Sequence, residues 1–336
     1  MLFKKMAIFL KRLLIIFFFV SYTSNLSASS QEFNKWLFDF KILAKKKGIS
    51  SLTIKRYLNN VKYLDRVIGY DNKQPEFFEK TDVYISKRSS IKSLKKAKQK
   101  YKEYSHIFNK VEKEFNVEKE LLLALWSIET NFGNYLGKMD ILSSLATLSF
   151  DKRRSKYFTN ELLILLSLAD KKIVSKEMLY GSWAGALGNF QFMPSTILNY
   201  GIDYDGDKKI DLKKSLPDSI ASAANYINKV GWKYKDTCFK EVIFTKEINK
   251  LFFNHSARSI KNKNISNFWN KKGIIIKSNK KPIDLDGVSA LVLPDGDISS
   301  PKYLVFSNYE TILKWNRSLR FGLSVCTLSK MIKNEI

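Results

Sequence analysis

One apolar stretch, residues 121–150, constrains the fold most, because it carries a single carboxylate inside a hydrophobic helix. Leu122, Leu125 and Trp126 lie seven, four and three residues before Glu129. At 3.6 residues per turn, these side chains share one helix face with the carboxylate. Glu129 is therefore expected to point toward an interior or a cleft, where desolvation raises the pKa of a carboxyl group. Such a group can act as a general acid; the alternative is a glutamate that caps a helix or pairs with an arginine.

Helical periodicity extends over most of the chain and predicts a mainly α fold of the α+β class. Residues 32–68 read as two amphipathic helices broken at Gly48, and residues 80–115 read as a strongly basic helical segment. The Glu129 helix is expected to end near Gly133, because glycine is common just past a helix end. Further helices are expected over residues 157–169, 219–231 and 310–332.

A different pattern occupies residues 239–304, where short β-prone runs alternate with turn signals such as Pro294-Asp295-Gly296. The runs are found at residues 241–244, 273–276 and 290–293. We expect a small β-rich subdomain inserted into one domain that spans residues 31–336.

The N-terminus has the layout of a secretory signal peptide. Four basic residues precede a short apolar run, 13–20, and Ala28-Ser29-Ser30 offers small residues for cleavage before Gln31. The run is too short to cross a bilayer comfortably, and an uncleaved anchor is the alternative. No cysteine lies near the cleavage point, which argues against a lipoprotein anchor. We therefore expect removal of residues 1–30 and export to the periplasm.

The charge balance indicates an anionic partner. The chain has 58 Lys and Arg against 32 Asp and Glu, a formal net charge of +26. Loss of residues 1–30 removes four positive charges and no acid, which leaves +22. Such a protein suits nucleic acid, an anionic membrane surface or an acidic polymer. Because the signal peptide predicts export, nucleic acid is not an expected partner.

Cysteine and histidine are scarce. The only cysteines are Cys238 and Cys326, and the only histidines are His106 and His255. In an oxidising compartment the cysteines can form one disulfide, although two unpaired thiols are equally compatible with the sequence. Two histidines leave little material for a His-based metal cluster or a Ser-His-Asp triad.

Two further segments carry polar residues in suggestive settings. Arg153 and Arg154 can hold an anionic group, or they can simply cap and pair. In the segment 181–195, Ser182, Asn189 and Gln191 interrupt a glycine-rich apolar run. Buried polar groups of this kind either satisfy their neighbours or, in a cleft, orient a ligand.

Residues 202–212 resemble a calcium-binding loop with alternating aspartates. The match to an EF-hand is partial, because the sixth position is Lys208 rather than Gly and the twelfth is Lys214 rather than Glu. A structural calcium or sodium ion and a plain Asp-rich turn are both compatible with this pattern. The candidate ligands are Asp203, Asp205, Asp207 and, from the following segment, Asp218.

Taken together, these segments resemble the lytic murein transglycosylases of the membrane-bound lytic transglycosylase B family. The resemblance covers nearly all of the chain after the signal peptide. A minor departure lies at Asn72-Lys73, where the family more often has arginine. The motifs that carry it are Asp71-Asn72-Lys73-Gln74-Pro75-Glu76-Phe77, Ile128-Glu129-Thr130-Asn131-Phe132-Gly133, Ala146-Thr147-Leu148-Ser149-Phe150, the segment from Gly181 to Ser195, Ala224-Asn225-Tyr226, Leu293-Pro294-Asp295-Gly296 and Trp315-Asn316-Arg317-Ser318.

The resemblance implies a lysozyme-like helical fold and cleavage of the bond between N-acetylmuramic acid and N-acetylglucosamine. It implies that Glu129 is the single catalytic acid/base, with no cofactor required for catalysis. It also places peptidoglycan glycan strands and cell-wall enzymes among the expected partners of a monomer. The substrate contacts that it implies are Tyr84, Arg153, Arg154, Ser182, Gln191, Tyr226 and Asn316.

The chemistry expected of a single carboxyl group differs from that of common glycosidases, which use two. Glu129 would protonate the leaving oxygen, and the muramyl N-acetyl group would stabilise the anomeric carbon. The sugar's own 6-hydroxyl would then attack within the molecule and give a 1,6-anhydro product. Two alternatives stay open: a muramidase in which water attacks, and a catalytically silent protein that binds glycan as a scaffold.

Overall fold

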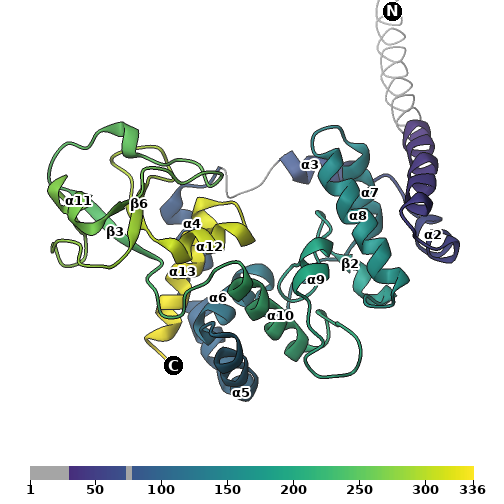
Figure 1. The fold of residues 1–336 in the computed structure, drawn as a ribbon, viewed down its shortest axis with the longest axis horizontal. Helices are drawn as coiled ribbons and strands as arrows, with labels where there is room; N and C mark the ends of the chain where they lie inside the picture. Colours follow the sequence, from purple (N-terminus) through teal and green to yellow (C-terminus); the bar gives the residue numbers. More distant parts are fainter. Residues whose placement is uncertain (1–29, 73–77) are drawn as a thin grey trace, which may run out of the picture.

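The computed structural model describes residues 30–72 and 78–336. The predicted signal peptide up to residue 29, and residues 73–77 of the first motif, lie outside the described residues. Helices form the body of the molecule, and the β-rich region forms a lobe at one end (Figure 1). Residues 30–46 form the first described helix. The others are α2 (Ser51–Leu58), α3 (Asp65–Asn72), α4 (Thr81–Arg88), α5 (Ile91–Phe115), α6 (Lys119–Thr130), α7 (Ile141–Phe150), α8 (Ser155–Asp170), α9 (Pro194–Tyr200), α10 (Leu216–Lys229), α11 (Ser266–Lys271), α12 (Ser307–Trp315) and α13 (Leu319–Lys333).

The predicted helical regions are correct, but three of them contain breaks that the periodicity did not show. The segment 32–68 holds three helices rather than two, because α3 is separate from α2. The segments 80–115 and 310–332 each divide into two helices. At two of these breaks a serine starts the next helix: Ser90 accepts a hydrogen bond from Ser93 N, and Ser318 accepts one from Phe321 N. An N-cap serine restarts a helix without interrupting its apolar pattern.

Helix α6 lies at the centre of the helical body and carries Glu129 near its end. Every residue from Glu120 to Ser127 is buried, so this part of the helix is enclosed on all sides. The sequence pattern had predicted a single buried face. Helices α5 and α13 pack against it. The helix ends as expected: Asn131 adopts a left-handed conformation with φ 49°, and Phe132 N donates to Trp126 O at 3.1 Å.

The predicted β-rich region is confirmed as an antiparallel five-stranded sheet with the order β4-β6-β7-β3-β5. Leu291 pairs with Leu304 near its centre, and Val242 pairs with Ile276 at its β5 side. The sheet has an apolar core of its own, built around the fully buried Trp269. The strands are β3 (Phe239–Phe244), β4 (Asn264–Ile265), β5 (Ile274–Ile276), β6 (Val288–Val292) and β7 (Lys302–Val305); β1 (Met139–Asp140) and β2 (Tyr180–Gly181) form a separate pair.

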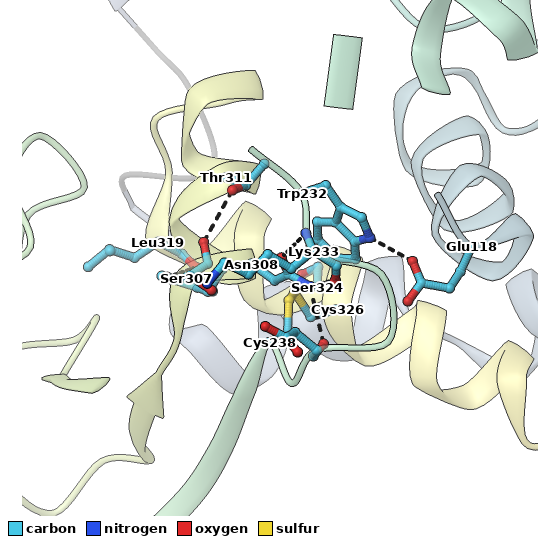
Figure 2. Close-up of a disulfide and its surroundings, with 12 residues drawn as sticks. Glu118, Trp232, Lys233, Cys238, Ser307, Asn308, Thr311, Leu319, Ser324 and Cys326 are labelled. Carbon is cyan, nitrogen blue, oxygen red and sulfur yellow. Dashed lines mark hydrogen bonds between the residues drawn. A yellow bond between two sulfur atoms is a disulfide. The ribbon is translucent and has the colours of Figure 1, made fainter. Parts of the chain in front are cut away.

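A disulfide joins the β-rich region to the helical body. Cys238, just before β3, is bonded to Cys326 in α13, with their Cα atoms 6.2 Å apart (Figure 2). The structure thus answers a question that the sequence left open. Nearby, Asn308 accepts a hydrogen bond from Lys233 N at 2.8 Å and donates one to Lys233 O at 2.7 Å. These contacts hold the segment that enters β3 against α12.

Among the described residues, no helix has both the length and the apolar character needed to cross a bilayer.

Candidate active site

Glu129 lies one residue before the end of α6, where burial gives way to partial exposure. Its Oε1 accepts a hydrogen bond from the indole Nε1–H of Trp315 at 2.8 Å, across 186 residues of sequence. Trp315 is the last residue of α12. The bond fixes one carboxylate oxygen of Glu129 in a part-buried setting.

Trp315 also belongs to an aromatic cluster contributed by three segments. Its ring stacks on Tyr226 of α10, with ring centroids 5.1 Å apart and an interplanar angle of 29°. Phe192 and Phe190 come from the segment 181–195. Their ring centroids lie 5.2 and 6.3 Å from that of Trp315. Aromatic pairs at such distances contribute beyond the area they bury. The indole that contacts Glu129 is therefore held rigidly.

Tyr226, a predicted substrate contact, is brought to the site. Its hydroxyl donates to Lys314 O at 2.8 Å. Burial, followed by the neighbouring Tyr200, raises the pKa of Tyr226 to about 12. The phenol is therefore protonated throughout the neutral range and remains a hydrogen-bond donor.

Asn189 connects the end of α6 to the segment that carries Gln191. Its Oδ1 accepts from Trp126 Nε1 at 2.9 Å, and its backbone oxygen accepts from Thr130 Oγ1 at 2.7 Å. A Cβ at Gly133 would lie 2.8 Å from Asn189 Oδ1, so this glycine allows the close approach. Because Thr130 follows Glu129 directly, this network sets the position of the carboxylate.

Gln191 and Ser182 lie beside the loop that follows α6. Gln191 Nε2 donates to Gly188 O at 2.9 Å and to Leu136 O at 3.4 Å. The next residue, Gly137, packs so tightly on the Gly181–Ser182 backbone that a Cβ would lie 2.0 Å from Gly181 O. Ser182 Oγ accepts from Ala186 N at 2.9 Å. Both predicted residues are thus near the Glu129 loop, and both are only partly exposed.

Asn316 occupies the break between α12 and α13, next to Trp315. Its backbone N donates to Ile312 O at 3.1 Å, and its backbone O accepts from Ser318 N at 2.8 Å. The backbone is therefore fixed while the side chain is partly exposed. The break, which the sequence did not show, therefore places Asn316 directly after the residue that binds Glu129.

The arginine pair lies farther along the helical body. Arg153 and Arg154 both form ion pairs with the buried carboxylate of Asp71, the first residue of the first motif. A hollow of about 880 Å³ lies beside them and is lined also by Lys47, Lys152 and Lys156. The arginines remain 49% and 40% exposed, so the ion pairs leave both accessible.

An electrostatic connection links this end to the break between α12 and α13, where Arg317 lies. Partial burial, followed by the charge of Glu161, raises the pKa of Tyr157 to about 12, whereas Arg154 and Arg317 act in the opposite direction. Tyr157 therefore lies within electrostatic reach of both arginines, one from each end of the site.

Tyr84 is placed differently from the other predicted contacts. It lies on α4, is only 3% exposed, and has the Arg88 guanidinium 3.4 Å from its ring centroid. Helix α4 packs on α13. Its role as a cleft residue stays a prediction.

The aspartate loop gathers three of its four predicted ligands. Carboxylate oxygens of Asp203, Asp205 and Asp218 all lie within 4.8 Å of one another. Asp207 is not part of this group. Its Oδ1 accepts from the backbone N of Lys209 at 2.8 Å. Asp218 is fully buried, and burial raises its pKa, an effect that opposing backbone hydrogen bonds only partly offset. Carboxylates crowded around a buried one fit a hard cation such as calcium.

Trp315, Phe190 and Phe192 are the site residues that sequence reasoning did not assign. All three lie within quoted motifs, and Trp315 directly precedes the predicted Asn316. For Trp315, this position next to Asn316 was the signal available in the sequence. The partner of Trp315, 186 residues away, has no local signature.

Comparisons with known proteins agree with the motif-based resemblance. The membrane-bound lytic murein transglycosylase B of Escherichia coli (strain K12) is 38% identical over 133 residues. That alignment covers 39% of this chain and only 37% of the relative's length.

Solved structures share the fold over most of the chain. SltB3 from Pseudomonas aeruginosa, in complex with NAG-NAM-pentapeptide, is 29% identical with a TM-score of 0.81, covering 90% of this chain and 79% of that one. The Escherichia coli lytic transglycosylase Slt35, in complex with calcium, is 26% identical with a TM-score of 0.72, covering 89% and 92%. The predicted lysozyme-like helical fold is confirmed.

The transglycosylase SLT domain family matches residues 32–330, which is nearly the whole chain. The protein therefore belongs to the transglycosylase SLT domain family.

Proposed function

We propose that this protein is a peptidoglycan lytic transglycosylase that cleaves the β-1,4 bond between N-acetylmuramic acid and N-acetylglucosamine. The observation that carries the proposal is the Glu129 carboxyl group, which lies at the partly exposed end of a buried helix and is fixed by Trp315. Family membership and the likeness to a protein crystallised with NAG-NAM-pentapeptide support it.

The Trp315 contact indicates which oxygen of Glu129 handles the proton. An indole N–H can only donate a hydrogen bond. Because it donates to Oε1, that oxygen acts as an acceptor in both protonation states, and the transferable proton resides on Oε2. The carboxyl group is thereby preorganised for one orientation of proton transfer.

The reaction then balances without water. Glu129 Oε2–H gives its proton to the glucosamine O4 as the bond from O4 to the muramyl C1 breaks. The muramyl acetamido group stabilises C1. The muramyl O6 bonds to C1, and its proton passes to Oε2, which restores the acid. The products are a new glucosamine 4-hydroxyl and a 1,6-anhydro-muramyl end.

The surrounding residues supply binding rather than proton transfer in this proposal. Tyr226 and the aromatic cluster offer apolar faces, and Ser182, Gln191 and Asn316 offer polar groups beside the sugar rings. Tyr84 is proposed to act from the α4 side. Arg153 and Arg154 are accessible cations that suit the lactyl or peptide carboxylates of peptidoglycan.

Mass spectrometry of digested peptidoglycan tests the reaction. Purified sacculi treated with the wild-type protein should release muropeptides with 1,6-anhydro-muramyl ends. Products heavier by one water would indicate a muramidase instead. If no soluble product forms while the protein binds sacculi, it is a scaffold and the catalytic proposal is wrong.

We further propose that Asp203, Asp205 and Asp218 hold a structural calcium or sodium ion. The Slt35 structure contains calcium, and the crowded carboxylates here have the chemistry for it. Calcium needs no part in catalysis in this proposal. The family loop is altered at Lys208, which has a left-handed φ of 69° without being glycine, so the affinity should be modest.

A thermal melt tests the cation site. Millimolar calcium should raise the melting temperature by a few degrees, because a ligand that binds the folded state stabilises it. Asp205→Asn should abolish the shift, whereas Asp207→Asn should keep most of it, since Asp207 lies outside the group. An unchanged melting temperature in calcium, for the wild type, would contradict the proposal.

We propose that the protein acts in the periplasm as a monomer on glycan strands, after removal of residues 1–30. The signal-peptide pattern and the family support export. Fractionation of expressing cells, with N-terminal sequencing of the exported form, tests this. A sequence beginning at Gln31 is expected.

A further inference from the structure

Two N-terminal helices expose large apolar side chains that the fold does not use. Phe38, Ile42 and Leu52 are 64%, 45% and 74% exposed. On the opposite side of the first helix, Phe33 and Leu37 are buried in the core. The inner face therefore accounts for packing, and within residues 30–72 and 78–336 nothing covers the outer face, which is available to a partner.

Two of these side chains, Phe38 and Ile42, border a basic hollow. Phe38 and Ile42 lie one helical turn apart, and Lys41 and Lys45 share their side of the helix. Helix α2 packs alongside and adds Lys55, so that the two helices enclose a shallow hollow of about 290 Å³. Leu52 lies outside the lining, three residues before Lys55 on α2. We call the six residues the N-terminal face: Phe38, Lys41, Ile42, Lys45, Leu52 and Lys55.

The charge of the N-terminal face selects the partner. The hollow is lined by three lysines and by no acid. Apolar side chains between lysines are the composition of a surface that inserts shallowly among anionic headgroups. A soluble acidic polymer would satisfy the lysines alone and would leave the three apolar side chains in water.

The position of the face agrees with such a partner. The helix of residues 30–46 and α2 lie at the end of the molecule away from the β-rich lobe (Figure 1). We propose that the N-terminal face binds the surface of a membrane rich in anionic phospholipid. The proposal does not depend on the catalytic assignment.

Vesicle flotation tests it with the chain that begins at Gln31. This chain retains the family region 32–330, and its core extends from Phe33 to Ile332. It should float with vesicles of phosphatidylcholine and phosphatidylglycerol, and much less with phosphatidylcholine alone. Because each lysine near an anionic surface contributes about fivefold, Lys41→Gln/Lys45→Gln/Lys55→Gln should weaken binding at least tenfold. Phe38→Ser/Ile42→Ser/Leu52→Ser should weaken it similarly.

Matched variants elsewhere in the chain distinguish binding by this face from a general effect of positive charge or of exposed apolar surface. The exposed Lys92, Lys95 and Lys102 of α5, changed to Gln, remove the same charge. The exposed Leu251, Ile265 and Ile298, changed to Ser, remove comparable apolar surface. Both control sets should retain binding close to the wild-type level, and all variants should digest dispersed sacculi at the wild-type rate.

Three results would overturn the proposal. The control lysine set could weaken flotation as much as the N-terminal set, which would indicate nonspecific charge attraction. The apolar variant could bind as well as the wild type, which would indicate that a soluble polyanion suffices. The wild-type chain could instead sediment as a dimer that the apolar variant abolishes, which would indicate that a second copy covers the face.

Discussion

The helical region around Glu129 and the β-rich region are held together by different kinds of contact. At the site, single side-chain bonds join segments distant in sequence, as Trp315 and Asn189 do with α6. In the β-rich region, backbone pairing along β3, β6 and β7 provides most of the order, over a separate apolar core. Activity should therefore respond to single substitutions at the site. Stability should respond to substitutions at the contacts that attach the β-rich region to the helical body.

Removing the proton-transferring carboxyl group of Glu129 should give the largest loss of activity and leave stability intact. Glu129→Gln keeps the shape of the side chain but cannot exchange a proton. Loss of general acid–base catalysis costs roughly 10²–10⁴-fold, and we expect the upper end because one group serves both steps. Release of soluble muropeptides measures it. Glu120→Gln, a buried glutamate on the same helix, is the matched control and should stay active. A fully active Glu129→Gln protein would disprove the site assignment.

Cutting the disulfide should have the opposite outcome, a loss of stability with little loss of chemistry. Cys238 and Cys326 close a loop across 88 residues. By the chain-entropy model, Cys238→Ala/Cys326→Ala should lower the free energy of unfolding by about 4.6 kcal/mol. Urea unfolding in the absence of reductant measures it, and reductant should destabilise the wild type equally. A double variant as stable as the oxidised wild type would show that the other contacts suffice to attach the β-rich region.

Removing the indole donor should give an intermediate effect on activity. Trp315→Phe keeps an aromatic ring but leaves Oε1 of Glu129 without its N–H partner. A hydrogen bond to a charged group contributes about 1.5–3 kcal/mol, so kcat should fall roughly tenfold to a hundredfold. Because the N–H favours the carboxylate form, the alkaline limb of the pH profile should move to higher pH.

The control for this variant lies outside the site. Trp232 Nε1–H also donates to a glutamate, Glu118, at 2.6 Å. Trp232→Phe should change stability without moving the pH profile. If both variants leave the profile in place, Trp315 does not orient the acid.

The Trp315 contact also marks the limit of what could be predicted from the sequence. Local spacing identified the Glu129 helix and its end, because apolar periodicity and the glycine after it act over a few residues. The β-prone runs were found for the same reason. A bond across 186 residues has no such local cause. The break at Asn316 was missed because apolar residues continue on both sides of it, and Ser318 caps α13 without disturbing that pattern.

The smallest expected effect lies at the second attachment of the β-rich region, Asp295. This residue follows β6 and accepts hydrogen bonds from the backbone N and the hydroxyl of Thr81, the latter at 2.6 Å. Arg320 of α13 donates to it at 2.7 Å. Lys80, the N-cap residue of α4, provides no side-chain cap, so Asp295 supplies one from a distant segment. The same carboxylate thus holds both α4 and α13.

Asp295→Asn should lower the free energy of unfolding by about 1–2 kcal/mol at neutral pH. Burial raises the pKa of Asp295, but the bonds from Thr81 and Arg320 outweigh it and lower the pKa below the ordinary 3.8. The folded state therefore favours the carboxylate. Its contribution is complete above pH 3.8 and is lost as the pH falls through the folded-state pKa. Urea unfolding at several pH values should show the wild type and Asp295→Asn converging in acid. The exposed Asp286→Asn removes the same charge and should match the wild type throughout; a constant gap for Asp295→Asn down to the lowest pH would mean that its shape, rather than its charge, attaches the β-rich region.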